Sequence, residues 1–174
     1  MKQLTQTQTQ VSPLMALIFR LLNQIEMIAL IGTAVGFAML YAEMAAAPDT
    51  LMIGMSVLSA TFFLKGYDPS LMPAQNEGDQ KPGFVELLAL KIIPKTGWIA
   101  CAMATVGILF VVLKLKGSAE MLMIGCSALT AVLVLIGLFV ALKPDRSALL
   151  IPLTYRAVPL WLMGGYLFMN IPTV

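Results

Sequence analysis

Long apolar runs separated by short polar breaks dominate the pattern of residues along this chain. A helix that crosses a lipid bilayer needs about 20 consecutive, mostly apolar residues. Five segments approach this requirement: residues 25–42 (preceded by a further apolar stretch at 14–22), 50–65, 97–113, 121–142 and 157–174. The last segment is interrupted by Pro159, Asn170 and Pro172, and a proline there leaves backbone groups in need of other partners. The pattern predicts an all-α polytopic membrane protein of about five transmembrane helices.

The polar breaks differ in length, and this difference predicts how the helices are grouped. Residues 45–49 and 116–118 are tight connections, which place two successive helices antiparallel and side by side. Residues 68–83 carry several Pro, Gly and Asn residues and are typical of a longer loop in water. The expected organisation is a disordered polar tail at 1–13, a first transmembrane hairpin at 14–67, a cytoplasmic loop at 68–83, a second transmembrane hairpin at 84–143 and a fifth transmembrane segment at 144–174.

The two predicted hairpins read as copies of one another. A shift of 71 positions, from Leu51 to Leu122, places Leu51-Met52-Ile53-Gly54 on Leu122-Met123-Ile124-Gly125. The same register continues upstream without a gap and places Val35-Gly36 on Val106-Gly107, which favours duplication of a helical hairpin. The fifth segment is expected to be a half-repeat. Two hairpins with the same orientation are parallel repeats, which argues against the inverted repeats of many alternating-access transporters.

Composition supports a membrane protein. Hydrophobic residues make up 59% of the 174 residues, charged residues make up 11%, and the mean hydropathy is +0.89. A soluble domain carries about 25% charged residues, so we infer that the lipid bilayer covers much of this surface. The formal net charge of +2 gives no indication of a nucleic-acid partner.

Side chains that carry out catalysis or bind metals are scarce. The chain has no His, which is the commonest metal ligand and a frequent general base. Cys101 and Cys126 lie in apolar runs at positions that do not match in the repeat, so small buried side chains are a better interpretation than a disulfide or a metal site. No nucleophile and base combination stands out either. The sequence therefore predicts no catalytic residues, no cofactor and no metal.

The distribution of positive charge predicts the orientation in the membrane. If the chain crosses five times, nine of its 11 Lys and Arg residues fall on the N-terminal side, and only Lys114 and Lys116 fall on the other. Lys and Arg concentrate in cytoplasmic loops. We therefore expect a protein of the bacterial inner (plasma) membrane, with its N-terminus in the cytoplasm and its C-terminus in the periplasm.

Glu26 is the candidate functional residue, because it is an ionisable group beside the apolar run that starts at Met27. One interpretation is that this carboxylate loads and releases a proton. The other is that it lies at the level of the lipid headgroups and forms an exposed ion pair with a basic neighbour, worth only about 0–1 kcal/mol. The matching position in the second hairpin is Gly97, which favours the ion pair.

Basic residues precede several of the predicted helices on the cytoplasmic side. Long basic side chains in such places reach the phosphates of lipid headgroups. The residues expected to do so are Arg20, Lys91, Lys95 and Arg156.

Glycines mark the expected close contacts between helices, because a residue without a side chain lets two backbones approach. Gly32-Thr33-Ala34-Val35-Gly36 is a match to the GxxxG pattern of membrane helix pairs. The glycines expected to pack in this way are Gly32, Gly36, Gly54, Gly107 and Gly125. Such packing serves either contacts within the chain or contacts between chains.

Each hairpin resembles GldL, the two-helix membrane subunit of the Bacteroidetes gliding and type 9 secretion motor. In that family a Gly-containing helix leads through a short turn to a Met-Leu-x-Ile-Gly helix, which Met121-Leu122-Met123-Ile124-Gly125 matches and Leu51-Met52-Ile53-Gly54 matches in large part. The family's turn carries His, Trp and Pro-Gly, which neither turn here does. Its second helix carries a Glu shortly beyond the Gly, where this chain has Leu58 and Leu129. The resemblance implies a related hairpin without implying the motor function.

These observations favour a non-enzymatic integral membrane subunit with a structural or assembly role. Its partners would be the lipid bilayer and either other membrane protein subunits or further copies of itself, because helix-packing residues are frequent and polar ones few. The alternative is a proton or ion conduit subunit of a membrane motor or transport complex. Glu26 and the resemblance to a motor subunit motivate that alternative.

Overall fold

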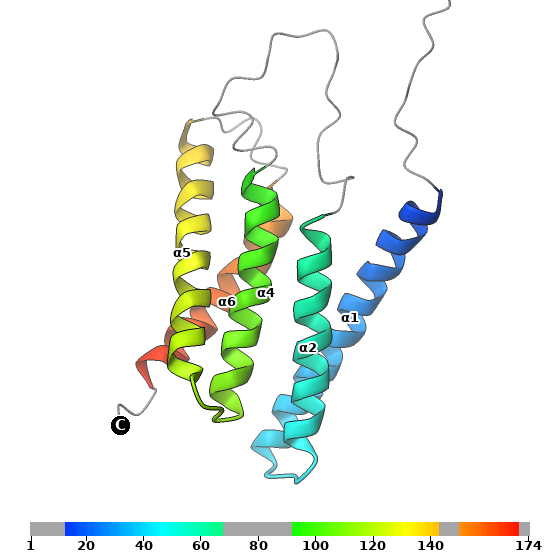
Figure 1. Ribbon diagram of the computed structural model, residues 1–174, viewed down its shortest axis with the longest axis vertical. Helices are drawn as coiled ribbons and strands as arrows, with labels where there is room; N and C mark the ends of the chain where they lie inside the picture. Colours follow the sequence, from blue (N-terminus) through cyan, green and yellow to red (C-terminus); the bar gives the residue numbers. More distant parts are fainter. Residues whose placement is uncertain (1–12, 68–91, 143–149, 171–174) are drawn as a thin grey trace, which may run out of the picture.

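The computed structural model describes residues 13–67, 92–142 and 150–170, and outside the turns these residues are helical. Figure 1 shows a bundle in which three helices have roughly parallel axes and the first and last helices are tilted. In chain order they are α1 (Pro13–Tyr41), α2 (Ala47–Lys65), α4 (Ile93–Val112), α5 (Ser118–Leu142) and α6 (Ile151–Met169). The tail predicted at 1–13 lies outside the described residues except for Pro13, which begins α1 and is therefore helical. The predicted loop at 68–83 lies outside the described residues.

The helices pack as two hairpins and one additional helix. α1 and α2 are antiparallel neighbours, as are α4 and α5, and α2 packs against α4 to join the two hairpins. α6 slants across both helices of the second hairpin and contacts α4 and α5 (Figure 1). α1 packs mainly on α2, so it lies at the edge of the bundle.

Four helices are long and apolar enough to cross a membrane, which supports a membrane protein. These spans are Leu21–Tyr41, Ala47–Lys65, Ile93–Val112 and Ser118–Ala141. α6 is not among them, because its 19 residues include Arg156, two prolines and four side chains with a hydroxyl or an indole N–H, namely Thr154, Tyr155, Trp161 and Tyr166. The described residues thus support an all-helical membrane protein with four candidate spans, one fewer than the sequence predicts.

Prolines begin three of the helices earlier than the apolar pattern predicts. Pro48, Pro94 and Pro152 each lie in the first turn of a helix, where the missing N–H is not needed and the fixed φ suits the helix. α6 therefore starts at Ile151 instead of residue 157. Pro159, expected near the start of the fifth segment, lies inside α6.

The turns of the two hairpins have the same backbone structure. Glu43 and Lys114 have φ values of 55° and 53°, the left-handed conformation that ends many helices. The next residue in each turn bonds back to the helix, Met44 N–H to the Met39 carbonyl at 3.0 Å and Leu115 N–H to the Phe110 carbonyl at 2.8 Å. Both turns therefore end their helices with a Schellman motif, at positions 71 residues apart.

Glycines let the two helices of each hairpin approach closely. A Cβ atom on Gly36 would lie 2.9 Å from the Leu51 side chain, and one on Gly107 would lie 2.9 Å from the Leu122 Cα. These two contacts occupy positions 71 residues apart. Gly54 against Thr33 and Gly125 against Ala104 form a second pair of matching contacts. The same small residues thus set the helix spacing in both hairpins.

Candidate functional site

A buried ion cluster links three helices at one end of the bundle. Glu26 of α1 is only 1% exposed, and its two carboxylate oxygens are ion-paired with the Lys65 ammonium of α2 and the Arg156 guanidinium of α6. The residues are far apart in the sequence, so the tertiary packing of the helices brings them together. We call Glu26, Lys65 and Arg156 the ion cluster.

The ion cluster lies near one edge of the apolar region. Lys65 is the last residue of α2, about 27 Å along that helix from Ala47 at 1.5 Å per residue. Glu26 lies about 22 Å from the end of α1 at Tyr41, by the same measure. Because the hydrocarbon layer of a bilayer is about 30 Å thick, the cluster is expected close to one headgroup region.

Asn23 and Trp98 provide further contacts to the two cations. Lys65 Nζ donates a hydrogen bond to Asn23 Oδ1 at 3.2 Å and lies 5.4 Å from the centroid of the Trp98 ring. The Arg156 guanidinium carbon lies 5.3 Å from the same centroid, and Arg156 Nη1 donates to the Pro152 carbonyl at 3.3 Å. Cation–π contacts of this kind are favourable where water is excluded. Trp98 of α4 therefore joins the ion cluster to a fourth helix.

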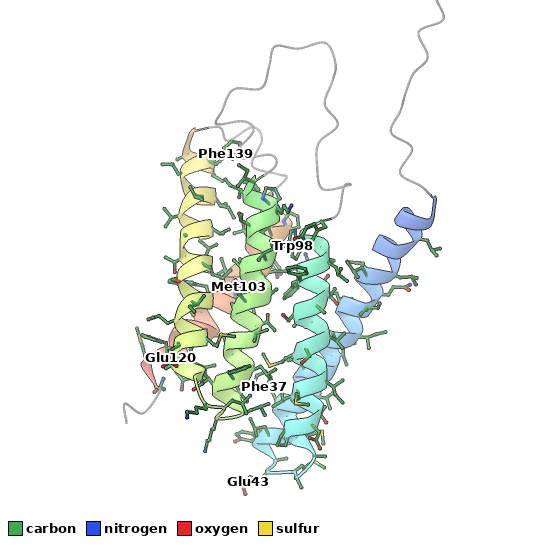
Figure 2. The ribbon with its side chains drawn as sticks, viewed as in Figure 1. Phe37, Glu43, Trp98, Met103, Glu120 and Phe139 are labelled. Atoms are coloured by element: carbon green, nitrogen blue, oxygen red, sulfur yellow. The ribbon has the colours of Figure 1, made fainter. Side chains whose placement is uncertain are left out.

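Figure 2 shows how Trp98 lies in the upper half of the bundle, while Glu43 lies in the turn at the opposite end. The Trp98 side chain is 4% exposed and packs beside Phe62, with ring centroids 5.8 Å apart. Trp98 therefore contacts both cations and an aromatic neighbour. Buried ions need such close partners because the loss of water is costly.

The cluster carries one negative and two positive charges. Each oxygen of the Glu26 carboxylate has one cationic partner. The Arg156 side chain retains 31% exposure, whereas that of Lys65 retains 11%. Arg156 is therefore the most accessible of the three side chains of the cluster. The arrangement is well suited to hold helices together.

The structure places Glu26 differently from the exposed ion pair that the sequence favours. The pairing with basic side chains is present, but the carboxylate is buried among three helices rather than exposed. The difference arises because α2 packs on this face of α1 and the Arg156 side chain reaches it from α6. Lys65, Asn23 and Trp98 were not identified from the sequence as parts of a site. The sequence does contain one signal for this pairing: Lys65 ends an apolar helix at about the same depth as Glu26.

The basic residues expected at lipid headgroups fall into different environments. The Arg156 guanidinium is directed toward Glu26 and Trp98. Lys95 is exposed, with its ammonium 4.6 Å from the centroid of the Tyr67 ring. Lys91 and the side chain of Arg20 lie outside the described parts of the structure. Binding of lipid headgroups by all four residues stays a prediction.

The five glycines expected to pack helices also divide into two groups. Gly36, Gly54, Gly107 and Gly125 lie at close contacts between α1 and α2 or between α4 and α5. A Cβ atom on Gly32, in contrast, would meet no described atom within 4 Å. The GxxxG pattern therefore has one glycine inside the hairpin and one that faces outward.

The described residues contain no group of three or more His, Cys, Asp or Glu side chains placed to hold a metal ion. Cys101 and Cys126 are both free thiols, and Cys101 is fully buried.

Comparisons with protein-family models, with curated proteins and with solved structures found no match to this chain.

Proposed function

We propose that this protein is a non-enzymatic membrane subunit that assembles with other membrane proteins, or with copies of itself, through the outer face of α1. The observation that carries this proposal is the difference between α1 and α4. On α4, the face formed by Cys101, Ala102 and Thr105 is at most 5% exposed, because α2 and α6 cover it. The residues 71 positions earlier on α1 are Leu30, Ile31 and Ala34, and these are exposed, with Ile31 at 61%.

The outer face of α1 has the shape that membrane helices use for association. Gly32 forms a flat position between the exposed side chains of Ile28 and Val35, which are 69% and 48% exposed. Small residues at such positions let a second helix approach closely and gain dispersion contacts. Lipid alone would also cover this face, but only a second helix would benefit from the close backbone approach that Gly32 allows.

Two experiments test the assembly. Gentle extraction followed by native mass spectrometry should give a mass above that of the monomer, and a single monomeric species would contradict the proposal. For the site itself, Ile28→Cys in a background of Cys101→Ala and Cys126→Ala should cross-link on mild oxidation. Val134→Cys on α5, 64% exposed, is the matched control and should cross-link much less.

The proposal also includes the internal repeat and the place of α6 in it. We infer a duplicated hairpin followed by a half-repeat, supported by the turns and glycine contacts that recur 71 residues apart. α6 runs in the same direction as α1 and α4, and Trp161 Nε1 donates to Thr130 Oγ1 of α5 at 2.8 Å. Ser59 of α2, the residue that matches Thr130, donates to the Ala102 carbonyl of α4. α6 thus meets α5 at the position where α4 meets α2.

In this proposal α6 makes a fifth crossing, and the protein belongs to the bacterial inner membrane. The N-terminus is in the cytoplasm and the C-terminus in the periplasm, an orientation supported by the excess of Lys and Arg on the N-terminal side.

A second candidate function is a proton or ion conduit, in line with the resemblance of the hairpins to a motor subunit. The observation that favours it is the burial of Glu26, since ionisable residues inside membrane proteins commonly mark ion pathways. The two cations beside Glu26 argue for the structural role. Activity of a Glu26→Gln variant that still assembles distinguishes the two functions.

A further inference from the structure

The ion cluster carries one positive charge in excess. Glu26 contributes one negative charge, whereas Lys65 and Arg156 contribute one positive charge each. Arg156 uses Nε for Glu26, and its Nη1 donates to the Pro152 carbonyl at 3.3 Å. Its other terminal nitrogen, Nη2, has no hydrogen-bond partner among the described residues, which contain no buried side-chain nitrogen or oxygen without a partner. Nη2 therefore lies on the exposed side of the cluster, where an anion can reach it.

A third basic residue lies at the same end of the bundle. Lys95 is in the first turn of α4, one turn before Trp98, whose ring contacts both cations of the ion cluster. Its backbone packs beside the end of α2, because a Cβ atom on Gly66 would lie 3.2 Å from the Lys95 carbonyl oxygen. Its ammonium is exposed and lies 4.6 Å from the centroid of the Tyr67 ring. Three helices therefore each bring one basic side chain to this end.

Acidic side chains do not balance this charge. Glu26 is the only side-chain carboxylate that the described residues place at this end. The other described carboxylates lie in or beside the turns at the opposite end: Glu43, Asp49 and Glu120. In the whole sequence, residues 1–26, 65–95 and 143–156 lead into or out of the helices at the cluster's end, and they contain nine Lys and Arg residues against six Asp and Glu residues. The excess positive charge favours an anion from outside the chain.

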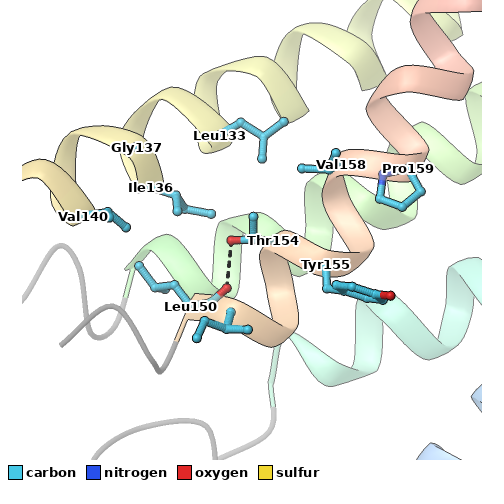
Figure 3. Close-up of a pocket in the computed structure, with 10 residues that line it drawn as sticks. Leu133, Ile136, Gly137, Val140, Leu150, Thr154, Tyr155, Val158 and Pro159 are labelled. Atoms are coloured by element: carbon cyan, nitrogen blue, oxygen red, sulfur yellow. Dashed lines mark hydrogen bonds between the residues drawn. The ribbon is translucent and has the colours of Figure 1, made fainter. Parts of the chain in front are cut away.

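The accessible part of Arg156 lies at the level where helices begin and end. Side chains in a helix lean toward its N-terminus, and the hydrogen bond to the Pro152 carbonyl holds the guanidinium one turn closer to the start of α6. Thr154 also bonds back to this first turn, since its hydroxyl donates to the Leu150 carbonyl at 2.9 Å (Figure 3). α2 ends and α4 begins beside it. Lipid phosphates are therefore expected at the level of the guanidinium, with their acyl chains deeper in the bilayer.

A phosphodiester fits the exposed side of the cluster. It carries one negative charge, which would make the cluster neutral. Its two unesterified oxygens match the planar N–H donors of a guanidinium. Basic pockets between membrane helices on the cytoplasmic side bind phosphate headgroups in this way. An anionic phospholipid is preferred to a zwitterionic one, because the latter would bring its own ammonium group close to Lys65 and Lys95.

We propose that one anionic phospholipid completes the ion cluster, with its phosphodiester bound to Arg156 Nη2 and with Lys95 beside it. This site differs from general anchoring, in which each basic side chain contacts headgroups independently. A specific site holds one lipid per chain. Its affinity also depends on Glu26, because Glu26 sets the net charge of the cluster.

The test is competition between phosphatidylglycerol and phosphatidylcholine, with identical acyl chains, in nanodiscs that contain the full-length protein. Bound lipid is counted by native mass spectrometry after transfer to detergent. We expect one retained phosphatidylglycerol per chain and about five-fold preference for it, the ratio that corresponds to about 1 kcal/mol for a basic residue near the membrane surface. Equal retention of the two lipids would overturn the proposal and leave an acidic side chain of a partner protein as the counter-charge.

Inorganic phosphate distinguishes a lipid site from a site for the free ion. The retained phosphatidylglycerol should withstand sodium phosphate as well as it withstands sodium chloride at equal ionic strength, because the acyl chains contribute to binding. Displacement by phosphate but not by chloride would overturn the lipid as the ligand.

Two lysine variants locate the site. Lys95→Gln removes one charge beside Arg156 and keeps a polar side chain, so it should lower the preference for phosphatidylglycerol at least two-fold. Lys116→Gln is the matched control, because Lys116 is also exposed but lies in the turn between α4 and α5 at the other end of the bundle. Equal effects of the two variants would show that the preference comes from surface charge in general.

Glu26→Gln tests the charge balance in the opposite direction. It raises the net charge of the cluster from +1 to +2, so the folded variant should retain several-fold more phosphatidylglycerol than the unmodified protein. It should also gain more in Tm on transfer from phosphatidylcholine to phosphatidylglycerol nanodiscs, because a bound ligand stabilises the folded state. Unchanged or lower retention in the folded variant would refute the proposal. The lysine variants remain informative if Glu26→Gln fails to fold, since both lysines are exposed.

Discussion

Replacing Glu26 by Gln removes the negative charge of the ion cluster and leaves two cations beside each other. The carboxylate is 1% exposed and has both oxygens ion-paired, so the change breaks two contacts at once. Removing one partner of a buried ion pair costs about 3–5 kcal/mol. Because Arg156 retains 31% side-chain exposure and can turn toward headgroups, we expect a loss near the lower limit, about 3 kcal/mol.

The assay is thermal unfolding of the purified protein in a mild detergent. A loss of about 3 kcal/mol corresponds to a decrease of about 6–12 °C in Tm, if the scaling for domains of 150–250 residues applies. Glu43→Gln is the matched control, because Glu43 is exposed in the turn between α1 and α2 at the other end of the bundle (Figure 2). We expect this control to change Tm by no more than about 1–2 °C, the effect of an ordinary surface substitution.

A double-mutant cycle with Arg156→Gln separates the ion pair from general effects. If Glu26 and Arg156 stabilise the fold through each other, the double variant should lose less stability than the sum of the two single variants. Purely additive losses would refute the pairing, and a Glu26→Gln variant as stable as the Glu43→Gln control would refute the buried cluster altogether. A stable, assembled but inactive Glu26→Gln variant would instead favour the proton conduit.

Three further predictions concern packing, assembly and orientation. Gly125→Ala should lower the free energy of unfolding by about 1–3 kcal/mol in denaturation experiments, because the new Cβ would lie 2.7 Å from the Ala104 Cα. Gly165→Ala, at an open position, should not lower it, and equal effects of the two substitutions would contradict the close contact. Gly32→Leu should leave Tm unchanged, because a Cβ at this position meets no described atom within 4 Å. The same substitution should reduce the oligomer fraction in native mass spectrometry, and an unchanged fraction would show that the interface does not include Gly32. A reporter enzyme fused after Val174 should be active only outside the cytoplasm, and cytoplasmic activity would mean that α6 does not cross.

Local patterns in the sequence predict the first four helices well, because each is an apolar run bounded by polar or turn-forming residues. The bounds are less predictable at proline-containing starts. The apolar count ignores that Pro94 suits the first turn of α4, so it places the start at residue 97 and misses the first four residues of the helix. For α6 the same effect moves the start from 157 to Ile151 and places Pro159 in the interior.

The ion cluster could be predicted only in part, because its members come from three helices. Hydropathy alone identifies Glu26 as unusual, but the side chains that surround it depend on how α6 packs across the other helices. Lys65 illustrates the difficulty, since a lysine at a helix end is read as a residue that reaches toward headgroups. Its contacts with Glu26, Asn23 and Trp98 depend on tertiary packing.

The ion cluster also constrains the order of events during membrane insertion. Glu26 and Lys65 belong to the first hairpin, so they can enter the bilayer together as a neutral pair. Arg156 leaves the ribosome only after 91 more residues, which at about 5–20 residues per second means a delay of about 5–20 s. During that interval the second carboxylate oxygen has no guanidinium partner. A chain truncated before α6 would keep this carboxylate oxygen without its guanidinium partner permanently, so its first hairpin would be held less firmly than in the finished protein.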